Sequence, residues 1–206
     1  ETIPLTTGGS TWANDNSTLF YTQKDEQTLR SSKIFRHRLG TSSLSDELIF
    51  AEEDETFGTF VFKTKSKKFL VIGSYSTLTS EYRILNADTP FEDFKIFQPR
   101  VRGLEYSISH YNDSFYVLTN MDGASNFKLM KTSDDTTSMD NWEEMIAHKE
   151  DVLLEDIDIF KDYYVISERS NGLNIIKVVK WDGTDSYYLP FDNETYTAFV
   201  SVNPEF

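Results

Sequence analysis

The chain has 206 residues, and its 34 acidic and 20 basic residues give a formal net charge of −14. An excess of negative charge of this size argues against nucleic acid as a partner, because the phosphate backbone binds basic surfaces. No run of about 18 apolar residues occurs, so we expect no membrane-spanning segment, and the lack of cysteine excludes disulfides and cysteine-bound metals.

One strand pattern recurs four times along the chain. Leu19, Leu70, Tyr116 and Tyr164 hold corresponding places in it and are separated by 51, 46 and 48 residues. A period of about 40 to 50 residues with four strands per repeat is typical of β-propeller blades. The 16 Phe and 11 Tyr residues also favour sheets over helices. We therefore predict an all-β fold, built from propeller blades of four antiparallel strands.

The repeats can be placed by their alternating apolar residues and by the turn-forming residues between them. In the first repeat, residues 9–53, we predict strands at Ser10–Trp12, Thr18–Thr22, Lys33–Arg38 and Glu47–Ala51. In the second, residues 57–99, they fall at Thr59–Lys63, Phe69–Ser74, Tyr82–Asn86 and Phe94–Phe97. In the third, residues 104–149, they fall at Tyr106–His110, Phe115–Thr119, Phe127–Lys131 and Glu143–Ala147. In the fourth, residues 152–191, they fall at Val152–Ile159, Tyr163–Glu168, Ile175–Lys180 and Tyr187–Leu189.

After the fourth repeat, Thr195–Val202 has the pattern of the first strand of a further blade. A lone strand is an awkward addition to four closed blades, so we expect residues 1–206 to be a partial propeller. An incomplete propeller leaves a strand edge unpaired, and such edges tend to pair with other chains. The sequence thus predicts that this chain on its own self-associates through exposed strand edges.

The chemistry of a serine hydrolase is not visible in the sequence. Its nucleophile would lie in a G-x-S-x-G turn between a strand and a helix, and Gly8-Gly9-Ser10 lacks the closing glycine and is expected to form a loop. His37, His110 and His148 lie in or beside predicted strands, where structural or solvent-facing roles are expected. We assign no catalytic residue and no cofactor.

Two acidic runs, Glu52–Glu55 and Glu155–Asp158, are candidates for metal sites. Neither has the glycine turn that a calcium loop requires, so we assign no metal ligand and expect the first run to be a solvated loop. In the second run, Asp156 and Asp158 share one face of a predicted first strand. First strands line the central channel of a propeller, so these two carboxylates are candidates for lining it. Ordinary exposure or a salt bridge is the alternative.

Arginines near the ends of strands are candidates for contacts with another domain or with a substrate. Arg169 follows Glu168 at the end of a predicted second strand, and we treat it as a candidate for such a contact. The alternative is a local ion pair, which contributes about 0–1 kcal/mol when exposed. The same two interpretations apply to Arg100 and Arg102, which lie in the connection between the second and third repeats.

Several ordered strings resemble one known family. They are Thr28-Leu29-Arg30, Glu53–Phe57, Thr79-Ser80-Glu81, Glu105–Tyr111, Glu150–Glu155, Ser167–Leu173 and Asn203-Pro204-Glu205. Together they are similar to the propeller of the oligopeptidase B (protease II) family, within the prolyl oligopeptidase type of serine peptidases. The resemblance extends over nearly the whole chain, from Trp12 to Phe206.

That resemblance implies a seven-bladed propeller joined to an α/β-hydrolase domain with a Ser-Asp-His triad. The propeller would admit only short peptides, which the enzyme would cleave after Lys or Arg. This chain would then supply about four blades plus one strand, without the catalytic domain, and would be inactive alone. Its partners would be its own catalytic domain and short basic peptides, in the cytoplasm or alternatively the periplasm. A standalone propeller that binds other proteins is the main alternative, and a glycosidase using Asp156 and Asp158 is a weaker one, because the two carboxylates lie too close on one strand.

Overall fold

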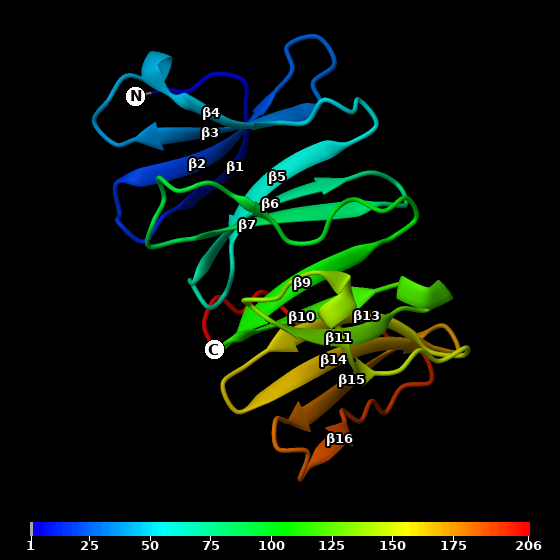
Figure 1. Ribbon diagram of the computed structural model, residues 1–206. Helices are drawn as coiled ribbons and strands as arrows, with labels where there is room; N and C mark the ends of the chain where they lie inside the picture. The colour runs from blue at the N-terminus through cyan, green and yellow to red at the C-terminus, as the bar shows by residue number, and fades with distance from the viewer. Residues whose placement is uncertain (1) are drawn as a thin grey trace. The chain divides into compact units, whose positions relative to one another are not determined.

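The computed structural model describes residues 2–206 and consists of four separate four-stranded antiparallel sheets with three short 3-10 turns (Figure 1). In every sheet the strands follow one another in chain order from one edge to the other. The sheets form two compact units, residues 1–103 and residues 104–206, with two sheets in each. The all-β blade architecture predicted from the sequence is confirmed. Within residues 2–206, no helix is long and apolar enough to cross a membrane.

The first unit contains eight strands and one 3-10 turn at Ser43–Ser45. Its first sheet is formed by β1 (Thr6–Trp12), β2 (Thr18–Lys24), β3 (Ser31–Arg38) and β4 (Glu47–Ala51). Its second sheet is formed by β5 (Gly58–Lys63), β6 (Phe69–Tyr75), β7 (Ser80–Asn86) and β8 (Lys95–Ile96).

The second unit repeats this arrangement and adds 3-10 turns at Met121–Gly123 and Met139–Asn141. Its first sheet is formed by β9 (Tyr106–Tyr111), β10 (Ser114–Thr119), β11 (Lys128–Ser133) and β12 (Glu143–Ile146). Its second sheet is formed by β13 (Leu153–Ile159), β14 (Tyr163–Ser170), β15 (Leu173–Lys180) and β16 (Ser186–Tyr188).

Most strands agree with the prediction to within a few residues, but β1 is longer than expected. The prediction of a loop at Gly8-Gly9-Ser10 was wrong, because all three residues lie inside β1. The pairing of β1 with β2 is irregular between Thr6 and Ser10, and Gly8 has a φ of +81°. A glycine accepts this left-handed backbone without the steric cost that a Cβ atom imposes, so the irregularity is accommodated within the strand.

In the first unit, the two sheets pack face to face through apolar side chains that come from alternating positions. The buried cluster consists of Ala13, Phe20, Ile34, Val61, Leu70, Ile72, Leu85 and Ala87. Phe20 is fully buried and meets the ring of Phe94 edge-on, with 5.6 Å between the ring centroids. The first strand of the second sheet, β5, lies against β1, β2 and β3 of the first sheet.

The second unit has a corresponding seam that is richer in aromatic residues. Its buried cluster consists of Tyr116, Leu118, Leu129, Leu154, Ile157, Ile159, Tyr164 and Ile166. The indole ring of Trp181 lies against the rings of Tyr111, Tyr116 and Tyr164, with centroid distances of 5.3, 5.1 and 4.7 Å. Here β13 lies against β9 and β10 of the preceding sheet, whereas β5 lies against β1, β2 and β3.

These clusters refine the repeat seen in the sequence. Leu70 and Tyr164 both face the sheet that precedes their own, whereas Tyr116 faces the sheet that follows. Tyr116 is therefore out of phase with the other two by one residue. The repeat itself holds, since each set of four strands is present, but the alignment of the third repeat moves by one position.

Residues 195–202, expected as the first strand of a further blade, belong to none of the described strands. A strand requires a hydrogen-bonded neighbour, and among residues 2–206 no strand pairs with this segment. Its interpretation as part of a further blade stays a prediction.

Candidate functional site

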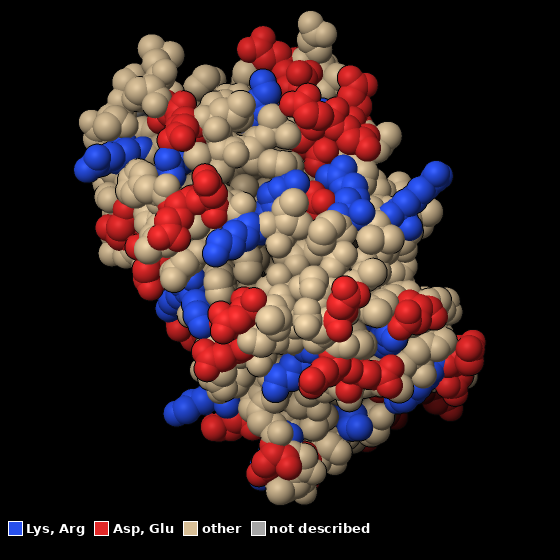
Figure 2. Space-filling model, viewed as in Figure 1, with Lys and Arg blue, Asp and Glu red and all other residues tan. Residues whose placement is uncertain are grey.

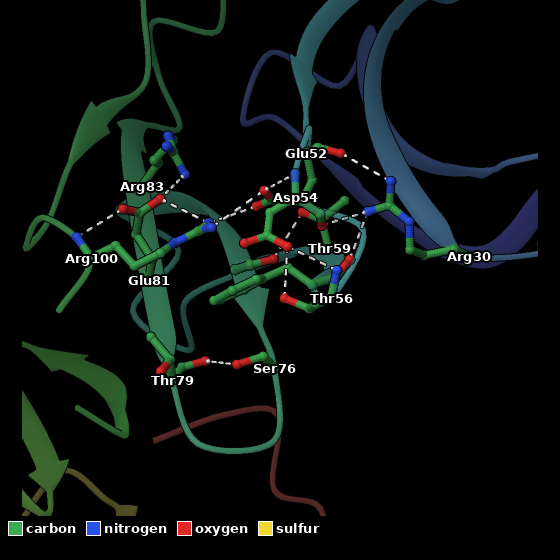
Figure 3. A network of polar contacts seen from close by, with 12 residues as sticks. Arg30, Glu52, Asp54, Thr56, Thr59, Ser76, Thr79, Glu81, Arg83 and Arg100 are labelled. Carbon is green, nitrogen blue, oxygen red and sulfur yellow. Dashed lines mark hydrogen bonds and ion pairs between the residues drawn. The ribbon is translucent and has the colours of Figure 1, made fainter. Parts of the chain in front are cut away.

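Each sheet has two distinct ends. One end of each sheet contains two segments: the turn between its second and third strands, and the connection that leads to the next sheet. We call this end the connection end. In the first unit it is formed by residues 25–30, 52–57, 76–79 and 97–103. Figure 3 shows the polar contacts at this end: Arg30, Glu52, Arg100, Glu81 and Arg83 are linked to one another, and Ser76 and Thr79 form a separate hydrogen bond.

Arg30 fixes the connection between the two sheets of the first unit. Its Nη1 atom donates hydrogen bonds to the carbonyl oxygens of Phe57 at 2.7 Å and Asp54 at 3.2 Å. Its Nη2 atom donates to the carbonyl oxygen of Glu52 at 3.1 Å. Asp54 in turn accepts hydrogen bonds from the backbone N–H and the hydroxyl of Thr56. Residues 52–57 therefore have one defined conformation, although the stretch contains no regular secondary structure.

Arg100 is the centre of the network and joins the two sheets. Its Nη2 atom lies 2.7 Å from Oε2 of Glu52, which follows β4, and 3.5 Å from Oε1 of Glu81, which lies in β7. The backbone N–H of Arg100 donates to Oε2 of Glu81 at 2.9 Å. The guanidinium carbon lies 3.7 Å from the centre of the Phe57 ring, a cation–π arrangement. Glu81 is also paired with Arg83 at 2.7 Å.

The carboxylates of this network are buried, which makes their pairing energetically important. The side chains of Glu52 and Glu81 are 5% and 7% exposed, whereas that of Arg100 is 27% exposed. Burial by itself would raise the pKa of Glu52, but hydrogen bonds from Arg100, Ser74 and the backbone of Asp54 outweigh it and lower this pKa below its ordinary value. The expectation of a solvated acidic loop was therefore wrong for Glu52 and holds for Glu53, Asp54 and Glu55, which are exposed.

Inspection of the sequence missed this pairing, although one signal was present. Glu52 and Arg100 are 48 residues apart, which is one repeat, because each lies in the connection that follows the fourth strand of its sheet. Opposite charges at equivalent positions of successive repeats are candidates for a bridge between neighbouring blades. Arg102, two residues further on, is exposed.

Asp156 and Asp158 lie on β13, an edge strand, and share one face, as predicted. The opposite face carries Ile157 and Ile159, which are buried in the seam. Asp156 is exposed and accepts a hydrogen bond from the backbone N–H of Ile157 at 2.8 Å. Desolvation of the carboxylate by neighbouring protein atoms raises the pKa of Asp156 despite this hydrogen bond. Lining of a channel by these two carboxylates stays a prediction.

Arg169 lies near the end of β14, at the connection end of the second unit. Its Nε atom donates to Oε1 of Glu155 at 2.7 Å, and the other carboxylate oxygen of Glu155 accepts a hydrogen bond from Asn174 at 2.9 Å. The Arg169 side chain is 44% exposed. It therefore makes a local ion pair and still presents part of its guanidinium to solvent, and a contact with another domain or with substrate stays a prediction.

Two of the three histidines lie in the interior. Nδ1 of His37 lies 2.7 Å from Oδ1 of Asp46, whose other oxygen accepts a hydrogen bond from the Tyr21 hydroxyl at 2.9 Å. Nε2 of His110 lies 3.5 Å from Oδ2 of Asp134. His148 is half-buried. Within residues 2–206 no group of three or more His, Cys, Asp or Glu side chains has the geometry of a metal site.

Comparison with known proteins places these sheets in a family. Residues 1–205 match the family described as prolyl oligopeptidase, N-terminal beta-propeller domain. The chain belongs to this family. The four sheets of four antiparallel strands are in keeping with the propeller of this family.

Relatives of this propeller chain are peptidases that are much longer. It is 38% identical to dipeptidyl aminopeptidase BI of Pseudoxanthomonas mexicana and 36% identical to protease 2 of Moraxella lacunata, each over 94% of this chain and 27% of the relative. It is also similar to the structure of oligopeptidase B from Trypanosoma brucei, which was solved with covalently bound antipain in a closed form. That match has a TM-score of 0.87 and 28% identity, and covers 96% of this chain and 29% of the other. The chain spans about a quarter of the length of these relatives.

Proposed function

We propose that this chain is the part of a longer serine peptidase that controls access of substrates to the active site. The observation that carries the proposal is the match of residues 1–205 to the propeller domain of the prolyl oligopeptidase family. Identities of 38% and 36% to two bacterial peptidases support it. The longer enzyme would cleave short peptides, because longer or folded chains would not pass the propeller.

The path of the chain through the sheets indicates where the catalytic domain would dock. Each sheet has four antiparallel strands in sequential order, so the chain enters and leaves every sheet at its connection end. Any domain that precedes or follows the blades in the sequence is therefore attached at that end. We propose that the catalytic domain packs there, against residues such as Arg169 and the exposed Glu53 and Glu55.

The charge of the chain supports basic substrates. The carboxylates shown in red in Figure 2 are distributed over both units, among fewer basic side chains, in keeping with the net charge of −14. A field of this sign raises the local concentration of cationic peptides and speeds their association, an effect that salt screens. Cleavage after Lys or Arg is our proposal. The names of the relatives differ in the reaction that they imply, so substrate preference is the point that most needs an experiment.

The experiment uses two proteins, the 206-residue chain and the longer protein that contains it. We expect the longer protein to hydrolyse fluorogenic peptides that end in Arg or Lys, and a serine-directed covalent inhibitor to abolish the activity. The 206-residue chain should give no hydrolysis above buffer, because its sequence contains no nucleophile in a G-x-S-x-G turn.

Peptides with Pro at the cleaved bond and peptides that release dipeptides serve as controls for specificity. A preference for either of these over Arg and Lys would contradict the proposed specificity while leaving the peptidase assignment intact. Hydrolysis by the 206-residue chain itself would overturn the proposal that this part of the protein only controls access.

A further inference from the structure

The hairpin between β14 and β15 contains the one Asn-Gly pair in the sequence. Ser170 at the end of β14 pairs with Leu173 at the start of β15, so Asn171 and Gly172 alone form the turn. Both residues have left-handed backbone angles, with φ of +50° and +81°, which a type I′ hairpin turn requires. Both are exposed. Their peptide groups are therefore accessible to water at the connection end of the second unit.

The atoms that take part in asparagine deamidation are not engaged in other contacts in this turn. In that reaction the backbone nitrogen of the next residue attacks the side-chain amide carbon of asparagine. Within residues 2–206, neither the Asn171 amide nor the N–H of Gly172 makes a hydrogen bond. Glycine has no Cβ atom to hinder the approach of its nitrogen, and even a Cβ atom added at Gly172 would have no neighbour within 4 Å. No contact therefore holds the nucleophile and the carbon that it attacks apart.

Other asparagines in left-handed turns lack one of these conditions. Asn16 has a φ of +54°, but the N–H of the next residue, Ser17, donates a hydrogen bond to Oδ1 of Asp15 at 2.9 Å. Asn112 has a φ of +53° in the hairpin between β9 and β10, but Asp113 follows it and carries a side chain next to the attacking nitrogen. Asn171 is therefore the asparagine whose turn favours the reaction most.

The carboxylates of the two Asp-Gly pairs are engaged in hydrogen bonds. Oδ2 of Asp122 accepts one from Nζ of Lys128 at 2.9 Å. Oδ1 of Asp182 accepts two, from the hydroxyl and the backbone N–H of Thr184 at 2.7 and 2.9 Å, and these bonds lower the pKa of Asp182. A carboxylate resists attack by a nucleophile because it already carries negative charge. Neither pair therefore competes with Asn171.

We propose that Asn171 is a site of spontaneous deamidation. The nitrogen of Gly172 forms a bond to Cγ of Asn171, and the side-chain nitrogen leaves as ammonia with the proton that Gly172 gives up. Water then opens the resulting succinimide ring at either of its carbonyl carbons, which gives aspartate or isoaspartate. Ring closure requires the backbone at Asn171 to rotate, so the reaction proceeds when the turn opens locally.

Either product alters the connection end of the second unit. Aspartate adds a negative charge two residues from Arg169, whose Nε atom donates to Glu155 at 2.7 Å. Isoaspartate also lengthens the backbone by one carbon, and a two-residue turn cannot take this up without a shift in the pairing of Ser170 with Leu173. The Ser170 hydroxyl donates to the carbonyl oxygen of Asp151 at 3.2 Å, so this shift would extend to the segment that precedes β13.

The site is tested by incubating the folded 206-residue chain at mildly alkaline pH and following each asparagine by peptide mass spectrometry. We expect loss of the Asn171 amide, with aspartate and isoaspartate both formed, while Asn16 and Asn112 keep their amides. An isoaspartyl methyltransferase with a labelled methyl donor measures the isoaspartate directly, because it esterifies the α-carboxyl group that isoaspartate exposes. Loss at Asn171 no faster than at Asn112 would overturn the proposal.

Asn171→Gly is the control variant, because it removes the reactive amide and glycine accepts the left-handed backbone of the turn. After incubation, labelling by the methyltransferase and a fall in melting temperature should both occur in the unsubstituted chain and be absent from the variant. Equal labelling of the two would place the isoaspartate elsewhere and overturn the assignment to Asn171. An unchanged melting temperature of the labelled chain would overturn the shift in pairing. None of these readouts depends on peptidase activity, so this inference and the proposed function can fail separately.

Discussion

The charge network around Arg100 makes a quantitative prediction for Arg100→Ala. The substitution leaves two carboxylates, Glu52 and Glu81, with side chains only 5% and 7% exposed and without their shared guanidinium. Removing one partner of a buried ion pair costs about 3–5 kcal/mol. Because the Arg100 side chain is itself 27% exposed, we take the lower end of this range and expect the free energy of unfolding to fall by about 3 kcal/mol. For a chain of this length that corresponds to a fall in melting temperature of about 6–12 °C.

The assay is urea unfolding followed by circular dichroism, with thermal unfolding as a second measurement. Arg102→Ala is the matched control, because Arg102 lies two residues away and is exposed, and its loss should change the free energy by no more than about 0.5 kcal/mol. Repeating Arg100→Ala in a Glu52→Gln background separates charge pairing from the packing of Arg100 on Phe57, since only the pairing is reduced there. If Arg100→Ala lowers the free energy of unfolding no more than Arg102→Ala does, the network does not hold the two sheets together.

Three further predictions concern pH and packing. Because the pKa of Glu52 is lowered from its ordinary value of 4.5 in the folded protein, its contribution to stability is present above that value and is lost as the pH falls through the folded pKa. In Glu52→Gln, the free energy of unfolding measured in urea should therefore fall less steeply between about pH 5 and 3 than in the unsubstituted chain. An equally steep fall in both would contradict this. The Asp15 carboxylate accepts four hydrogen bonds from Ser17 and Thr18 that together outweigh desolvation and lower its pKa to about 2, so a carbon-13 titration should find it near that value and not near 3.8. Gly73→Ala would bring a Cβ atom to 2.4 Å from the Phe60 ring and should cost about 1–3 kcal/mol in urea unfolding, and a cost near zero would mean that this ring moves freely.

The repeat could be predicted because it depends on local features. Turn-forming residues and alternating apolar residues are visible in a single sequence, and they located four sets of four strands. Family membership could also be predicted, because the ordered strings that carry the resemblance extend along almost the whole chain.

Features that depend on one residue of register could not be predicted. The pairing of β13 with β14 shifts between Leu154 and Asp156, so that Leu154 is buried on the same side as Ile157 although simple alternation would group it with Asp156. A bulge of this kind adds one residue without any change in composition. The alignment of Tyr116 with Leu70 and Tyr164 was wrong by one residue for a similar reason. A shift of one residue moves a side chain to the opposite face of its sheet.

The candidate site was only partly visible because it depends on contacts between repeats. The acidic run at Glu52–Glu55 looks uniform in the sequence, yet only Glu52 turns inward, where Arg100 of the next repeat meets it. Composition favours a solvated loop, and nothing within the run distinguishes its first residue. Asp156, Asp158 and Arg169 lie on the strands predicted for them, and their roles in lining a channel or in contacting another domain or a substrate stay predictions.

The most direct test of the central claim, that these blades control access to a peptidase site, is a comparison of substrate sizes. The longer protein would be given a short peptide containing one Arg and, separately, a stable folded protein with the same sequence in an exposed loop. Our account predicts cleavage of the short peptide alone, with loss of activity on treatment with a serine-directed inhibitor. Cleavage of both substrates at similar rates would contradict a role for this propeller in controlling access.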